Sequence, residues 1–271
     1  MQPTLNIALR AARIASEQIA RSVERLDIIK SEQQSVSEFI TETTIAAEKS
    51  AAYHIHKAHP KHRVIGQHGG IYEDEEPQGD TEWHISPIDG LTNFANGLPL
   101  FAFTLVYREK GRNEHVVVIN PITGEEFTAS RGRGAQLNGK RIRVSDLKSL
   151  NTALIGCDYI NSTSQKGTLD TYLNIYRQIS EQHAQIQSYG SAALTLAYVA
   201  AGRIDSCCMM SLSDWELNPG MLLIQEAGGL MGDFSGNNNS LNNGNLVAGN
   251  PRMFKQVLQA IQPALTAKLK N

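Results

Sequence analysis

The side chains in this chain best suited to chemistry are carboxylates, and Asp89 lies within the unusual stretch WHISPIDGLTNF at residues 83–94. Hydrolysis of a phosphate monoester requires neutralised phosphate oxygens, an activated water and a stabilised leaving oxygen. Two or three Mg2+ ions held by clustered carboxylates can supply all three. A Pro-x-Asp-Gly sequence by itself more often marks an ordinary turn, so the residues around Asp89 must decide between the two interpretations.

The stretch as a whole resembles the metal-binding loop of the inositol monophosphatase family, roughly W-x-x-D-P-[IL]-D-G-T-T-N-F. Similar segments follow along the chain, at residues 190–194, 197–203, 226–229 and 247–251. The resemblance implies an α+β fold, a layered αβαβα sandwich, with Mg2+ as the cofactor. It also implies metal ligation by Asp89, Glu216 and the backbone carbonyl of Ile88, and substrate binding by Gly90, Gly190, Ser191 and Ala192.

Five positions in the same pocket depart from the family pattern. Gln67 stands where the family has a glutamate ligand, Ser86 where it has a bridging aspartate, and Leu91 where a threonine helps to activate water. His68 replaces a second glutamate and is a poor ligand for a hard cation, which prefers oxygen. Met209 replaces a glutamate that binds inositol hydroxyls.

The charge lost at Gln67 and Ser86 predicts weak metal binding. A unit charge 4 Å from a dication, at an effective dielectric constant of 20, contributes a gross attraction of about 8 kcal/mol. If about a quarter of this remains after desolvation, each lost carboxylate weakens binding about thirtyfold. We therefore expect a catalytically inactive or severely weakened site.

Other acidic residues admit two interpretations each. The resemblance aligns Glu38 with the aspartate that works with the family's threonine, which would leave Glu38 and Asp89 as catalytic remnants, although a solvated carboxylate at a helix start fits Glu38 equally well. Asp214 is expected to be an N-cap or a surface acid rather than a ligand beside Glu216. The acidic run at residues 73–76 would provide substitute ligands in a different loop arrangement, but such runs usually form solvated surfaces.

The 271 residues are enough for one large domain or two closely packed halves, with a boundary expected near residue 145. In residues 1–145, helices are predicted at 4–22 and 41–58, followed by an antiparallel meander with strands at 101–107, 115–119 and 126–129. Residues 146–271 alternate strands and helices. Strands are predicted at 153–156, 205–209, 230–234 and 245–248, and helices at 168–182, 190–201, 218–227 and 251–262.

Composition narrows the function classes. A net charge of −2 gives no direct nucleic-acid signature, and no signal peptide or membrane span is visible, so a cytoplasmic location is expected. Arginines near a predicted hairpin, Arg131 and Arg133 among them, are expected to be solvated charges rather than an RNA contact. The run CCMM at residues 207–210 is predicted to fill the core, since neighbouring strand residues point to opposite faces, which does not suit a soft-metal site.

These observations favour a weakened family member that acts through binding. Within the family, the closest similarity is to bacterial members implicated in ribosomal RNA transcription antitermination, which implies NusA or RNA polymerase as the partner, and homodimers are common in the family. The small residues at 190–201 suit either the core or such a dimer interface. The rival is an active Mg2+-dependent inositol-1-monophosphatase using Asp89, Glu216 and Glu38, and a third alternative is a metal-independent sensor of a small molecule.

Overall fold

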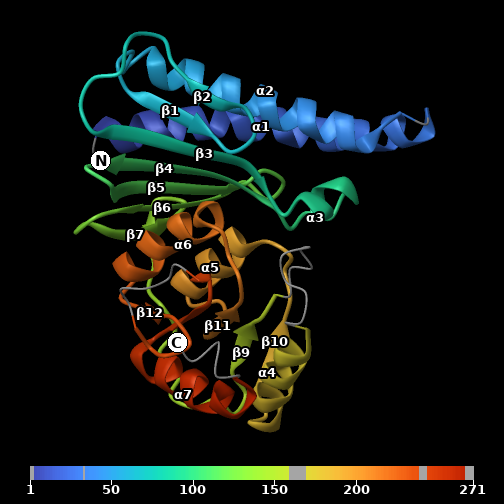
Figure 1. The fold of residues 1–271 in the computed structure, drawn as a ribbon, viewed down its shortest axis with the longest axis vertical. Coiled ribbons are helices and arrows are strands. Elements are labelled where there is room, and N and C mark those ends of the chain that lie inside the picture. The colour runs from blue at the N-terminus through green and yellow to red at the C-terminus, as the bar shows by residue number, and fades with distance from the viewer. Residues whose placement is uncertain (1–2, 33, 159–168, 238–242, 266–271) are drawn as a thin grey trace. The chain divides into compact units, whose positions relative to one another are not determined.

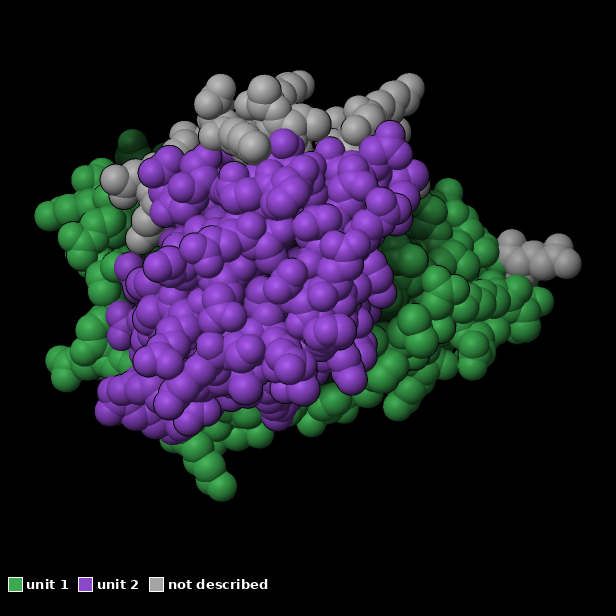
Figure 2. Space-filling view, turned by 90° about the horizontal axis from the view of Figure 1, so that it is seen from below, with its two compact units in different colours: residues 1–140 green, residues 141–271 purple. Residues whose placement is uncertain are grey.

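The computed structural model describes residues 3–32, 34–158, 169–237 and 243–265, which form two compact units. Figure 2 distinguishes unit 1, Met1–Lys140, from unit 2, Arg141–Asn271. This division lies close to the boundary expected near residue 145. None of the helices within the described ranges is long and apolar enough to cross a membrane.

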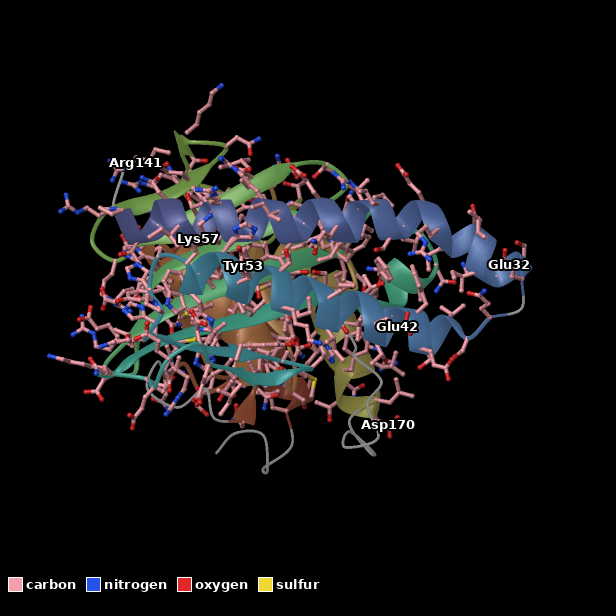
Figure 3. The ribbon with its side chains drawn as sticks, turned by 90° about the horizontal axis from the view of Figure 1, so that it is seen from above. Glu32, Glu42, Tyr53, Lys57, Arg141 and Asp170 are labelled. Carbon is pink, nitrogen blue, oxygen red and sulfur yellow. The ribbon has the colours of Figure 1, made fainter. Side chains whose placement is uncertain are left out.

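Two antiparallel helices, α1 (Pro3–Ser31) and α2 (Val36–His56), lie side by side on one face of the unit 1 sheet (Figures 1 and 3). Helix α1 extends beyond its predicted end at residue 22 because Leu26 and Ile29 continue its buried face. Helix α2 begins before the predicted residue 41, since Ser35 caps it by accepting a 3.2 Å hydrogen bond from the Glu38 backbone N–H.

Unit 1 contains a mixed sheet with the strand order β2-β1-β3-β4-β5-β6-β7-β8. Strands β1 and β3 are parallel, and the meander predicted after them is present as β4, β5 and β6. The register between β3 and β4 shifts between Ser86 and Asp89, around Pro87, which cannot donate a ladder hydrogen bond. The strands are β1 (Arg63–Gly66), β2 (Gly70–Tyr72), β3 (Thr81–Asp89), β4 (Ala102–Glu109), β5 (Arg112–Asn120), β6 (Glu125–Ser130), β7 (Gly134–Leu137) and β8 (Lys140–Arg141).

Unit 2 is built on a five-stranded sheet with the order β10-β9-β11-β13-β12. Helices α4 and α7 share a core cluster with the sheet, whereas α5 and α6 pack on each other. Helix α6 begins at Asp214, before the predicted residue 218. The elements are β9 (Leu154–Gly156), α4 (Leu169–Glu181), β10 (Gln185–Gln187), α5 (Ala192–Ala200), β11 (Ser206–Met209), α6 (Asp214–Glu226), β12 (Leu230–Gly232), β13 (Leu246–Gly249), α7 (Pro251–Ile261) and the 3-10 helix η3 (Gln262–Ala264).

The cysteine pair of β11 fills the core of unit 2, as predicted. Cys208 belongs to the cluster with α4 and α7, whereas the Cβ of Cys207 lies near Gly156, which also adjoins Thr195 of α5. Burial raises the pKa of the Cys207 thiol, and a hydrogen bond with Cys157 raises that of Cys208. Both thiols therefore stay protonated, which does not suit a thiolate metal site.

A row of aromatic and imidazole rings runs through unit 1. The rings of His59 and His62 stack with centroids 4.3 Å apart, and Trp83 Nε1 donates a 3.0 Å hydrogen bond to His62 Nδ1. Tyr107 continues the row, with centroids 4.8 Å from Trp83 and 5.6 Å from His115. Burial lowers the pKa of all three histidines; the charges of His59 and His56 add to this at His62.

This row predicts that the protein loses stability in mild acid. The three histidine pKa values are lower in the folded chain than in the unfolded chain, where a histidine titrates near about 6.5, so the unfolded chain takes up protons first. Their contribution is complete above about pH 6.5 and is lost as the pH falls toward the lowered values. We expect the urea midpoint to be lower at pH 5.5 than at pH 7.5. His115→Gln should reduce this difference, whereas His183→Gln, at an exposed position, should not.

Candidate functional site

The loop that carries Asp89 follows β3 directly. Asp89 ends the strand with 8% of its surface exposed, and Ile88 before it is buried. Gly90 has a φ of 101°, a conformation that side chains disfavour, and it is the N-cap residue of the short helix α3 (Leu91–Ala95). The strand, the left-handed glycine and the helix thus fix the Asp89 carboxylate at a sharp turn. The turn interpretation of Pro87-x-Asp89-Gly90 and the candidate-site interpretation therefore describe the same loop.

Ser86 and Gln67, the two positions in unit 1 at which the resemblance predicts substituted metal ligands, are bonded to each other. Ser86 Oγ donates a 2.5 Å hydrogen bond to Gln67 Oε1. Ser86 is buried and Gln67 is exposed, and the Gln67 backbone N–H donates to the Ile85 carbonyl at 2.9 Å. The amide oxygen at the predicted glutamate position therefore already accepts a hydrogen bond from the hydroxyl at the predicted aspartate position.

This donor set does not fit Mg2+. In unit 1, Asp89 is the carboxylate left at the predicted ligand positions, and its two neighbours at those positions are neutral and mutually hydrogen-bonded. Mg2+ retains its water shell unless charged oxygens offset the loss. Across the described residues, no three His, Cys, Asp or Glu side chains form a metal-holding group. The acidic run at residues 73–76 is exposed, as expected for a solvated loop.

Glu48, a residue that the sequence reasoning did not single out, holds the loop of Gln67 in place. It is fully buried on α2 and accepts hydrogen bonds from the backbone N–H groups of His68 at 2.8 Å and Gly69 at 2.7 Å, and from Tyr72 Oη at 3.0 Å. Desolvation, together with the Glu48 charge, raises the pKa of Tyr72. The signal available in the sequence was an acid among the small apolar residues of a helix face.

The loop glycines beside Glu48 leave no room for a side chain. A Cβ on Gly66 would collide with the Glu48 carboxylate, and one on Gly69 would collide with the Tyr72 hydroxyl. Close approach of backbone and carboxylate is what allows two successive N–H groups to reach Glu48. The position of Gln67 is thus set from α2 as well as from β3.

Glu38 and Leu91 lie in positions that favour simpler roles. Glu38 is exposed in the first turn of α2, where a carboxylate also suits the helix dipole. This placement supports the helix-start interpretation that the sequence left open. Leu91 is the first residue of α3 and is 37% exposed. Its side chain has no group that could orient a water molecule.

In unit 2, Asp158, which sequence reasoning also missed, holds the segment around the predicted substrate-binding residue Gly190. The buried Asp158 carboxylate accepts hydrogen bonds from Ser188 Oγ at 2.6 Å, the Gly190 backbone N–H at 2.9 Å and Thr195 Oγ1 at 3.0 Å. Ser191 is the N-cap of α5 and accepts a 3.3 Å bond from the Leu194 backbone N–H. The Gly190 N–H and the Ser191 hydroxyl therefore already have partners within the fold.

Asp158→Asn is expected to lower the free energy of unfolding by about 1–3 kcal/mol, because the amide NH2 would face at least one donor and leave it unbonded. Chemical denaturation followed by circular dichroism measures the change. Asp146→Asn, at an exposed position of the same unit, should lie within about 0.5 kcal/mol of the original protein. Equal losses in the two variants would contradict a positioning role for Asp158.

Glu216 is occupied at the start of its own helix. Glu216 Oε2 accepts hydrogen bonds from the Ser213 backbone N–H and from Ser213 Oγ, both at 2.7 Å, within a capping box. Ser213 is thus the N-cap of α6. Of the two roles expected for Asp214, N-cap or surface acid, the structure shows the second, since Asp214 is exposed. Met209 is fully buried in β11 and offers no hydrogen-bonding group to a sugar.

The candidate site in unit 1 thus consists of a strand-end carboxylate, a glycine-capped helix and a loop fixed by a buried acid. The sequence pattern of the inositol monophosphatase family matches residues 1–267. The chain belongs to this family, whose members are generally Mg2+-dependent.

Comparison with individual proteins supports the assignment. The protein named Nus factor SuhB in Pseudomonas aeruginosa is 49% identical over 271 residues, which is 100% of both chains. Its counterpart of the same name in Escherichia coli K12 is 42% identical over the same span. A crystal structure of the extragenic suppressor protein SuhB from Bartonella henselae has a TM-score of 0.85 at 28% identity and covers 97% of this chain and 100% of that one. The predicted layered α+β sandwich is confirmed.

Proposed function

We propose that this protein is a catalytically silent or severely weakened member of its family that acts by binding other proteins. The observation that carries the proposal is the hydrogen bond from Ser86 Oγ to Gln67 Oε1, which joins two neutral groups at ligand positions. The structure around them is well defined, with the Gly90 turn after Asp89 and the loop of Gln67 bound to Glu48. A family fold whose predicted metal ligands have lost their negative charge suits the binding of other proteins better than hydrolysis.

Calorimetric titration with Mg2+, run beside a phosphatase assay on inositol 1-phosphate, tests the silent site. We expect no saturable Mg2+ binding at millimolar concentration and no turnover above background. Tight binding of Mg2+, or hydrolysis at ordinary enzyme rates, would contradict the proposal that the site is catalytically silent.

The proposal that this protein binds other proteins is supported by the relatives named Nus factor SuhB, which match over their full length. We propose the same role here, in antitermination of ribosomal RNA transcription, with NusA or RNA polymerase as the direct contact and the cytoplasm as the location. Binding of purified NusA and of RNA polymerase to the immobilised full-length chain, followed by biolayer interferometry, tests it. Failure of both proteins to bind would overturn the partner assignment while leaving the silent site standing.

A homodimer is also proposed, with α4 at its interface. The small residues of α5 that suggested an interface are buried within unit 2. By contrast, α4 exposes Leu169, Leu173 and Tyr176 at helical spacing, with 47%, 51% and 43% of their surfaces accessible. We expect light scattering to give twice the chain mass, and Leu173→Glu to shift the protein to a monomer. A monomeric original protein would refute the dimer.

The rival function, an active phosphatase with altered metal preference, is favoured by the carboxylates that remain, Asp89 and Glu216. In this rival, Glu216 would bind the metal through Oε1, because Oε2 already accepts both hydrogen bonds that stabilise the start of α6. Manganese in place of magnesium in the same assay distinguishes the two functions. Turnover that depends on Mn2+ and disappears in Asp89→Asn would establish the rival.

A further inference from the structure

A cavity of about 340 Å3 opens beside β6 and β7 within unit 1, away from the residues assigned above to the candidate site. Polar side chains line one of its sides: Thr128 and Gln136 are directly paired across the two strands, so they leave the same face of the sheet. Ser130 follows two residues after Thr128 on that face, and Leu5 of α1 adds an apolar surface. Ligand pockets span roughly 300–1,000 Å3, so this one suits a small metabolite.

Arg133 brings an uncompensated positive charge to this cavity. The neighbouring arginines are paired, Arg13 with Glu126 at 2.6 Å and Arg131 with Glu114 at 3.3 Å. In the part of the chain that the structure describes, no carboxylate pairs with the Arg133 guanidinium, which lines the cavity. A guanidinium presents a planar set of donors that matches a carboxylate or a phosphate.

Thr128 supplies a second, independent indication of a ligand. Its side chain lines the cavity, the residue is only 6% exposed, and its hydroxyl has no hydrogen-bond partner within the described ranges. A ligand in the cavity can therefore accept or donate a hydrogen bond at this hydroxyl without displacing a partner within the fold. Ser130 is held differently, with its Oγ 2.8 Å from His115 Nδ1.

We propose that this cavity binds a small hydroxyl-bearing organic anion, whose carboxylate or phosphate pairs with Arg133 and whose hydroxyl groups bond to Thr128 and Gln136. The carbon frame would lie against Leu5. The first turn of α1 contains no acidic residue, and the N-terminal end of a helix favours negative charge. Nothing in this arrangement requires a metal, so the site operates whether or not the Asp89 loop binds one.

Calorimetry on the full-length chain with glycerol 3-phosphate, D-glycerate and uncharged glycerol tests the site. We expect at least one of the two anions to bind and glycerol not to, and a difference between the anions identifies the favoured group. Arg133→Gln should weaken binding at least tenfold and Thr128→Val severalfold. Lys140→Gln, which removes an exposed cation that does not line the cavity, should leave the affinity unchanged.

Three results would overturn the proposal. The first is that neither anion binds at millimolar concentration to a protein whose circular dichroism is native. The second is that binding survives both Arg133→Gln and Thr128→Val unchanged. The third is that binding is abolished by Asp89→Asn and not by Arg133→Gln, since the anion would then occupy the loop after β3 instead.

Discussion

Mg2+ affinity should rise about a thousandfold in the triple variant Gln67→Glu, Ser86→Asp, Leu91→Thr. Each restored carboxylate is worth roughly thirtyfold by the charge argument, and the two together give about three powers of ten. The change also removes the hydrogen bond from Ser86 Oγ to Gln67 Oε1 and places two negative charges side by side. Without metal the variant should be less stable than the original, because these charges repel one another in a partly buried place.

Calorimetry gives the Mg2+ affinity. Thermal melts with and without about 10 mM Mg2+ give the stabilisation of the folded protein by the bound metal. The matched control is Gln67 unchanged with Ser86→Asn and Leu91→Thr, which keeps the shape of the restored residues but adds no charge. We expect the control to bind no better than the original. Phosphatase activity that appears with the triple variant alone would show a site disabled by charge loss, whereas equal affinities in all three proteins would contradict the electrostatic argument.

Glu48→Ala is expected to lower the free energy of unfolding by about 3 kcal/mol or more. The substitution leaves three donors unbonded in the interior: the N–H groups of His68 and Gly69, and the Tyr72 hydroxyl. Glu48→Gln should fall between the original and Glu48→Ala, because its amide keeps one acceptor but turns an NH2 toward a donor. Urea unfolding of each variant measures the change.

The control for Glu48 is Glu42→Ala, on the same helix but exposed, labelled in Figure 3. We expect it to lie within about 0.5 kcal/mol of the original protein. Hydrogen exchange adds a local test, because the His68 and Gly69 amides should lose protection in Glu48→Gln even if the global stability changes little. Unchanged protection at both amides would contradict the role assigned to Glu48.

Local patterns predicted most of the longer elements, whereas the short strands β2, β7, β8 and β10 and the ends of two helices were not predicted. Strand alternation located β4, β5 and β6, and the start of α7 was correct. The end of α1 was missed because Leu26 and Ile29 continue its buried face sparsely, among charged residues. The start of α6 was missed because the signal is the Ser213–Glu216 capping box, and Glu216 had been given a metal role instead.

The site was harder to predict because it depends on contacts between distant residues. Resemblance to the family identified Ser86 and Gln67 as substituted positions, but not that they bond to each other across strands β1 and β3. Glu48 and Asp158 were not predicted, because the sequence does not distinguish a buried acid from a surface acid unless the groups that donate hydrogen bonds to it are known. Those donors lie 20 to 24 residues away from Glu48 and 30 to 37 away from Asp158.

The cysteines give an experimental handle on the two units. All three belong to unit 2 and are buried, and unit 1 contains none. A thiol-reactive dye will therefore label the chain only when unit 2 opens. In a Trp215→Phe variant, which lacks the tryptophan of unit 2, the fluorescence of the buried Trp83 responds to unit 1. Comparing the two signals along one urea titration separates independent melting of the units from a single concerted transition.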